Sequence, residues 1–282
     1  MAKKNDRNAP CKCNSGKKFK NCCMNMNSGK NIYGLSRTIP PDIKFTVRQK
    51  YGFGCIICGT GIIEYEHVDP EYKDAKKHDP DCITILCPTC HAKKTRGFLS
   101  TESVKRAMTK PKSLESGFPK DTIDLVEENY PKILFAGSLI ENCPIPISIN
   151  GKSLFEIKSP EIGKVGYRLS ATFYNSKGEI SLEIIDNEWI STSDNWDLEV
   201  TGGKLKIKDS QNFQTLILKV VNSDTIEIEQ IHSQIQNVTI VGDKNSFTIT
   251  DEKGKSNEFS DCIFSNCNIG FSINYAPIGV AS

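Results

Sequence analysis

The chain has 282 residues, which is too long for one small motif and suits two or three compact units. Its residues are 38% hydrophobic and 25% charged, and this ordinary balance excludes a wholly disordered chain. No apolar run follows the basic N-terminus, and the longest one, residues 133–140, is too short to cross a bilayer. We therefore expect a soluble, cytoplasmic protein with no membrane partner.

Charge is divided unevenly along the chain, although the net charge is only +2. Residues 1–110 contain 21 Lys and Arg against 10 Asp and Glu, whereas residues 111–282 contain 15 against 24. A basic segment suits a polyanion, because neutralised phosphates release their condensed counterions. The charge distribution therefore predicts that any contact with nucleic acid is made by residues 1–110.

The first motif along the chain is a pair of cysteine doublets within the basic residues 1–30. Residues 15–19, Ser-Gly-Lys-Lys-Phe, lie between the doublets, and four thiolates at this separation can surround one zinc ion. Spacing and intervening residues closely resemble the SEC-C motif, a zinc-binding segment found on many unrelated proteins. The resemblance implies a structural zinc ion held by Cys11, Cys13, Cys22 and Cys23. Such a knuckle either docks on a protein or a nucleic acid, or is only a soluble appendage.

The next segment, residues 31–110, is expected to alternate short helices and strands. Residues 25–34 have little apolar content and are predicted to be a linker. Helical spacing, strand-like runs and turn residues then predict a helix at 41–51, a β-hairpin at 55–66, a strand at 83–86, a helix at 88–97 and a helix at 101–108.

A second cysteine cluster lies inside this segment. Two Cys-x-x-Cys pairs, with 28 residues between them, predict a zinc site formed by Cys55, Cys58, Cys87 and Cys90. Zinc at this site would tie the hairpin to the helix that starts at Pro88. Glu66, His67 and His91 would then converge, and they supply a carboxylate and imidazoles that suit a divalent ion beside a general base.

The residues Tyr65-Glu66-His67-Val68, together with residues 83–95, resemble the HNH endonuclease module, in the zinc-bearing branch of that ββα-metal family. The resemblance implies that the protein hydrolyses DNA, with a role in restriction or phage defence. His67 would be the general base, while Glu66 and His91 would hold a catalytic magnesium or manganese ion. The residues that would contact the DNA backbone are Lys93, Lys94 and Arg96.

One residue departs from the HNH pattern. Cys82 stands where the family usually has Asn, which orients the base histidine, and Cys is a poor hydrogen-bonding substitute. A backbone carbonyl or Asp81 could take over this role. The alternative is a degenerate zinc protein that binds DNA or a protein partner without cutting. His78, in a loop rich in Lys and Asp, is predicted to be solvated.

The acidic part of the chain is predicted to be rich in β-strands. Alternating Ile residues at 145–149, then Asn150-Gly151, then an apolar run at 154–157 predict a hairpin with a type I′ turn. Further strand patterns follow as far as residue 241. Residues 260–269 contain a five-residue near-repeat, which either stacked coils or two edge strands would explain. No motif assigns this region a chemistry, so partner binding, oligomerisation or regulation of the nuclease is expected of it.

Taken together, these patterns predict an α+β chain. Its expected parts are a zinc knuckle at residues 1–30, a ββα-metal HNH nuclease module at 31–110, a linker at 111–144 and a sandwich-like all-β domain at 145–282.

Overall fold

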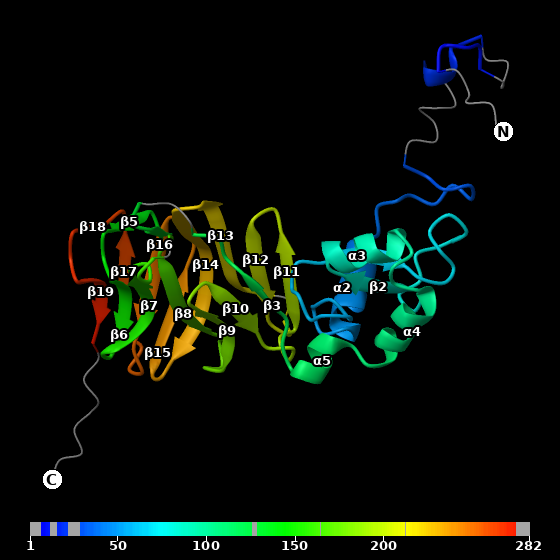
Figure 1. Ribbon diagram of the computed structural model, residues 1–282. Coiled ribbons are helices and arrows are strands. Elements are labelled where there is room, and N and C mark those ends of the chain that lie inside the picture. The colour runs from blue at the N-terminus through cyan, green and yellow to red at the C-terminus, as the bar shows by residue number, and fades with distance from the viewer. Residues whose placement is uncertain are drawn as a thin grey trace. The chain divides into compact units, whose positions relative to one another are not determined.

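The computed structural model describes residues 7–11, 16–21, 29–125, 129–163, 165–211 and 213–274 (Figure 1). The chain divides into two compact units. The first consists of residues 1–47 and 65–84, and the second of residues 48–64 and 85–282. The division passes through one helix and through both strands of a two-stranded sheet, β1 (Glu64–His67) and β2 (Ile83–Leu86).

All helices in the described part of the chain are short. They are the 3₁₀-helix η1 (Phe19–Asn21) and the α-helices α2 (Pro41–Lys50), α3 (Pro88–Thr95), α4 (Thr101–Thr109) and α5 (Lys112–Ser116). The start of α4 is capped by the Ser100 hydroxyl, which accepts a hydrogen bond from the Ser103 amide at 3.1 Å. Among the described helices, none is long and apolar enough to cross a membrane.

Residues 29–37 of the first unit form a tight loop, which includes the described part of the predicted linker, residues 29–34. The Asn31 amide donates to the Leu35 carbonyl at 2.9 Å, and the Gly34 amide donates back to the Asn31 carbonyl at 3.0 Å. Gly34 adopts a φ of 80°, which a residue with a side chain rarely tolerates. The interior of this unit contains the buried side chains Ile39, Val47, Val68, Ala75 and Ile83.

Two large sheets make up most of the second unit. One has the order β19 (Ile269–Ile273), β6 (Ile145–Ile149), β7 (Lys152–Lys158), β8 (Arg168–Tyr174), β9 (Ile180–Ile185), β10 (Glu188–Ser191) and β3 (Lys120–Thr122). The other contains an antiparallel run of β11 (Asp197–Thr201), β12 (Lys204–Lys208), β13 (Gln214–Asn222), β14 (Thr225–Ile235), β15 (Val238–Gly242), β16 (Ser246–Thr250) and β17 (Ser256–Ser260). It is extended by β4 (Lys132–Phe135), β5 (Ser138–Glu141) and β18 (Ile263–Ser265).

The two sheets share one apolar core. Figure 1 shows the green strands β6 to β8 lying over the orange strands β14 and β15. Phe155 and Leu182 from one sheet and Ile226 and Phe247 from the other are all buried in the same cluster. The rings of Phe247 and Phe271 meet edge to face across the sheets, with 5.0 Å between their centroids. Alternating apolar residues on each sheet therefore pack as a β-sandwich.

The hairpin predicted at residues 145–157 is confirmed. β6 and β7 pair antiparallel, with Ile147 opposite Phe155. Asn150 and Gly151 between them have φ angles of 49° and 76°. Positive φ at both central residues is the requirement of a type I′ turn, which explains the choice of Asn-Gly.

The near-repeat at residues 260–269 lies in a segment that stacks on an earlier one. β18 pairs parallel with β5, and β19 pairs parallel with β6. Asn142 and Asn266 occupy matching corners between these strands, both with positive φ, and their side chains are hydrogen-bonded to each other. Each segment thus passes from one sheet to the other through an Asn corner, as in the coils of a solenoid.

The predicted α+β fold class, with a ββα-metal module at its centre, is wrong. The described chain is mainly β, with nineteen strands in three sheets, and no ββα-metal HNH module is evident in it. Residues 55–61 form turns, closed by the Cys55 amide on the Thr60 carbonyl at 2.9 Å, where a hairpin strand was expected. Residues 111–144, predicted as a linker, carry α5 and the strands β3, β4 and β5. The spacing of the motifs predicts which nearby residues can be ligands. It does not predict which distant strands pair, and strand pairing determines the fold class.

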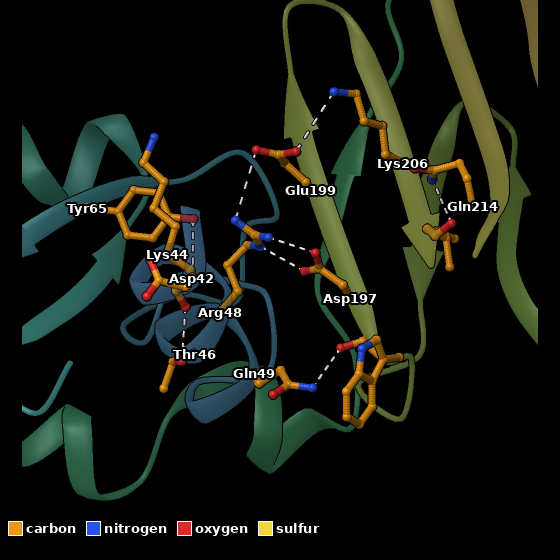
Figure 2. Close-up of polar contacts among 12 residues, drawn as sticks. Asp42, Lys44, Thr46, Arg48, Gln49, Tyr65, Asp197, Glu199, Lys206 and Gln214 are labelled. Carbon is orange, nitrogen blue, oxygen red and sulfur yellow. Dashed lines mark hydrogen bonds and ion pairs between the residues drawn. The ribbon is translucent and has the colours of Figure 1, made fainter. Parts of the chain in front are cut away.

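A buried ion pair joins the end of α2 to the second sheet (Figure 2). Arg48 and Asp197 are each 5% exposed. The guanidinium donates Nε to Oδ1 at 2.8 Å and Nη2 to Oδ2 at 2.7 Å, so the pair is bidentate. Beside it, the Gln49 side chain donates to the Trp196 carbonyl at 3.0 Å. The residues from Arg48 onward are thereby fixed to β11.

Replacing Arg48 with Ala should lower the free energy of unfolding by about 3–5 kcal/mol, because it leaves the Asp197 carboxylate buried without its partner. The measurement is urea unfolding followed by the fluorescence of Trp189 and Trp196. Lys206→Ala is the matched control, since Lys206 meets the half-exposed Glu199 at 3.8 Å and should cost at most about 1 kcal/mol. Equal losses in the two variants would contradict a structural role for the Arg48 pair.

Candidate functional site

Four cysteine side chains of the second unit converge on one point. The sulfur atoms of Cys55, Cys58, Cys87 and Cys90 all lie within 4.8 Å of one another. Cys58 Sγ is 3.6 Å from Cys87 Sγ and 3.9 Å from Cys90 Sγ. Cys58 is exposed and the other three are buried. This is the convergence that the spacing of the two Cys-x-x-Cys pairs predicts.

Local backbone geometry presents each cysteine pair. In the first pair, Gly59 has a φ of 82° and its amide donates to the Cys55 carbonyl at 2.8 Å, which closes the turn. In the second pair, Cys87 is the N-cap of α3, and its sulfur accepts from the Cys90 amide at 3.4 Å. Pro88 at the first helical position has the φ that a helix start needs. Both pairs therefore have the shape of metal knuckles.

The chemistry of the cluster fits zinc. Four sulfur donors at a closed site are the ligand set of a structural zinc ion. A hydrogen bond from Cys55 lowers the pKa of Cys58 to about 4, whereas burial raises the pKa of Cys90 to about 12. One thiolate is therefore favoured by the protein, and zinc would stabilise the others. With four cysteine ligands, such an ion would have no open position for substrate and would be structural.

His91 lies directly beyond the cluster, in the first turns of α3. Its Nδ1 is in close contact with Oε2 of Glu64, the first residue of β1. The imidazole is 30% exposed and the carboxylate 50%, so the pair is open to solvent. The sequence reasoning missed Glu64, although its spacing of two from Glu66 on a strand predicts that both carboxylates lie on one face.

His67, the predicted general base, is paired with a second histidine. It lies at the end of β1 in the first unit and is 6% exposed. Its Nε2 is 3.1 Å from Nδ1 of His78. Burial and, secondly, the nearby His78 lower the pKa of His67, and the charge of Glu66 opposes them in part. The neutral imidazole is therefore favoured.

The prediction that His78 is solvated is wrong. Besides its contact with His67, its Nε2 is buried and has no hydrogen-bond partner among the described residues. Spacing along the chain gave no signal for this contact, because the loop at 69–81 has no regular pattern. The only available signal was that His78 lies in the same short window as His67 and His91.

Cys82, at the position expected for Asn, contributes through its backbone. Its carbonyl accepts a hydrogen bond from the Val68 amide at 2.8 Å, directly after His67. Burial raises the pKa of its thiol, which favours the neutral form. A carbonyl thus holds the backbone beside His67, at Val68, and does not contact the imidazole itself.

The predicted DNA-contacting residues are accessible to different degrees. Lys93 and Arg96 are exposed, and Lys94 is half-buried. Lys93 and Lys94 lie in the last turn of α3, and Arg96 is its C-cap. These positions offer positive charge on the helix that also carries His91.

Part of the N-terminal knuckle is described. Cys11 is buried, and its amide donates to the Lys17 carbonyl at 2.9 Å; Gly16 has a φ of 70°. The other three predicted ligands, Cys13, Cys22 and Cys23, lie outside the described residues.

Residues 7–25 match the SEC-C motif. The match covers all four cysteines of the first cluster and agrees with the resemblance drawn from their spacing. No HNH family model matches. No curated protein and no solved structure matches the chain. Zinc binding is thus supported at both cysteine clusters, by the motif at one and by geometry at the other.

The purified chain should contain about two zinc ions, one at each cluster, by inductively coupled plasma mass spectrometry. Cys87→Ser should reduce this content by one and lower the midpoint of thermal unfolding, because metal binding is coupled to folding. Cys143→Ser is the matched control, since Cys143 is also buried but lies outside both clusters. An unchanged zinc content in Cys87→Ser would exclude Cys87 as a ligand.

Proposed function

We propose that the chain is a metal-dependent endonuclease that hydrolyses DNA phosphodiester bonds with HNH-type chemistry. The observation that carries the proposal is the contact of His91 with Glu64. His91 directly follows Cys90, the last cysteine of the cluster. A carboxylate and an imidazole on adjoining elements, held by a structural cluster, are a starting set of ligands for a catalytic ion.

The donor set is suited to magnesium or manganese. Glu64 and Glu66 are two residues apart on β1 and share one face of the strand. Carboxylate oxygens with one imidazole form a hard-to-borderline set that leaves room for water and phosphate oxygens. We assign Glu64 and His91 as ligands on the basis of their contact, whereas the assignment of Glu66 rests on the resemblance to the HNH family alone. An ion bound by them would stabilise charge on the scissile phosphate and on the departing 3′ oxygen.

His67 is assigned as the general base. Its Nε2 contacts His78, so proton transfer from the attacking water is assigned to Nδ1. His78 is a positioning residue, because a contact of 3.1 Å holds the orientation of the His67 ring. The hydrogen bond from Val68 to the Cys82 carbonyl holds the backbone on the other side of His67.

DNA contact is assigned to the basic part of the chain. Lys93, Lys94 and Arg96 would bind backbone phosphates, which position the duplex without reading its sequence. The excess of basic residues before residue 111 supports this assignment. A role in restriction or phage defence follows only by analogy with the resembling family.

A second candidate is a zinc protein that binds DNA without cutting it. The replacement of the usual Asn by Cys82 favours it, because the thiol cannot supply the hydrogen bonds of an amide. The SEC-C motif or the β-rich region would then provide contacts to a protein partner.

The test is nicking of supercoiled plasmid with magnesium or manganese, with EDTA as the metal-free control. His67→Ala should lower the nicking rate by about 10²–10⁴-fold, because it removes the group that accepts the proton of water. His232→Ala is the matched control, since His232 lies on β14, far along the chain, and should leave the rate unchanged.

Each outcome separates the two candidates. Nicking by the wild type that His67→Ala leaves intact would overturn the assignment of the base. If the wild type binds DNA but does not nick it, the Cys82→Asn variant is tested in the same nicking assay. Activity gained by Cys82→Asn would show a site disabled by one residue, and continued silence would favour the binding protein.

A further inference from the structure

The first unit contains a basic pocket that includes none of the residues assigned to the candidate site. Its volume is about 260 Å³, close to the lower limit of about 300 Å³ for typical ligand pockets. Two segments form it, the tight loop at 29–37 and the loop that follows β1. The lining residues are Lys30, Asn31, Ile32, Arg37, Tyr72 and Lys73.

Asn31 fixes the two segments together. Its Nδ2 donates to the carbonyls of Tyr72 and Ala75, both at 2.6 Å. Its Oδ1 accepts from the amides of Tyr33 and Leu35, both at 3.0 Å. All side-chain functions of Asn31 are thus used to shape the loop and hold it on the opposite segment. The backbone of both segments that line the pocket is therefore fixed by hydrogen bonds.

The chemistry of the pocket fits a phosphate group. Three of its six lining side chains are cationic, and none is acidic. The Arg37 guanidinium lies over the Tyr72 ring, 4.9 Å from its centroid, which orients the donors of its planar fork. Lys73 also meets Glu71 at 3.1 Å, but both side chains are largely exposed, so this pair is weak. A dianionic or phosphodiester ligand would compete successfully for Lys73.

Tyr72 connects the pocket to the candidate base. Its hydroxyl donates to the Leu35 carbonyl at 2.8 Å, which fixes the ring as one wall of the pocket. The same ring meets the imidazole of His67 edge to face, with 5.6 Å between centroids. A group bound against Arg37 therefore lies one aromatic ring away from His67.

We propose that this pocket binds a backbone phosphate of the DNA strand being cleaved and so fixes the strand relative to His67. The inference rests on the proposed function, because that function makes His67 the general base. The phosphate site itself depends only on Arg37, Lys30 and Lys73. The pocket holds one phosphate group with part of its sugar. It supplies a contact to the backbone and reads no base sequence.

The test is binding of a fluorescent DNA duplex by anisotropy at several salt concentrations, without added magnesium or manganese. Arg37→Gln should weaken binding about tenfold, the equivalent of about 1.4 kcal/mol. It should also reduce the slope of log affinity against log salt by about one, because one phosphate contact is lost. Lys77→Gln is the matched control, since Lys77 also lies in this unit but pairs with Asp79 at 2.8 Å outside the pocket.

The outcomes distinguish the pocket from the hydrolysis. Equal affinity and slope in Arg37→Gln and Lys77→Gln, with unchanged thermal unfolding, would overturn the pocket, as would a wild type that binds no DNA. Binding that depends on Arg37 in a protein that never nicks plasmid would support the pocket and overturn the nuclease. Inorganic phosphate at constant ionic strength should compete only weakly, and displacement of the duplex at low phosphate concentration would overturn a DNA strand as the ligand.

Discussion

The convergence of four cysteine sulfurs within 4.8 Å is the constraint on which the rest of the candidate site depends. An eight-residue helix such as α3 is too short to be stable alone in water, and a two-stranded sheet such as β1–β2 is marginal at best. The cluster compensates for the weakness of the helix, because Cys87 is at once a candidate ligand and the N-cap of α3. The position of His91 follows directly, since it is the next residue after Cys90 on a helix whose start is fixed.

The acidic β-rich region holds part of its negative charge in buried ion pairs. Asp197 forms an ion pair with Arg48, at the end of α2. Because the pair is buried, the negative charge of Asp197 does not lie on the surface. Glu229 is likewise buried, and its carboxylate is within 4.0 Å of Lys204, Lys219 and Lys244. Part of the negative charge that the sequence places after residue 110 is therefore neutralised inside the fold. The remaining acidic residues of this region lie outside residues 1–110, so they do not argue against DNA contact by the basic residues.

Sequence reasoning succeeded where the signal was local. Three features were predicted correctly because each depends only on residues close in sequence. They are the Asn150-Gly151 turn, the helix start at Pro88 and the cysteine spacing. It failed for fold class because parallel pairs such as Leu139 with Ile263 join segments that share no local pattern. It failed at Glu64 and His78 for a related reason. The spacing of Glu64 from Glu66 predicts a shared strand face but not its contact with His91, and only the folded chain shows which partner each side chain meets.

The two histidines of the proposed chemistry have opposite surroundings, and this difference supports their different assignments. His67 is buried and contacts another imidazole, and these two effects outweigh the charge of Glu66, so the neutral form of His67 is favoured. His91 is partly exposed and meets a carboxylate, which suits a nitrogen that shares a cation with oxygen ligands. Environments that separate two groups of the same type commonly mark which one moves a proton and which one holds charge. The Tyr72 ring adds a third element, because it places a cationic pocket beside the histidine that must receive the proton. A strand phosphate held there would orient the attacked bond without adding charge to the base itself.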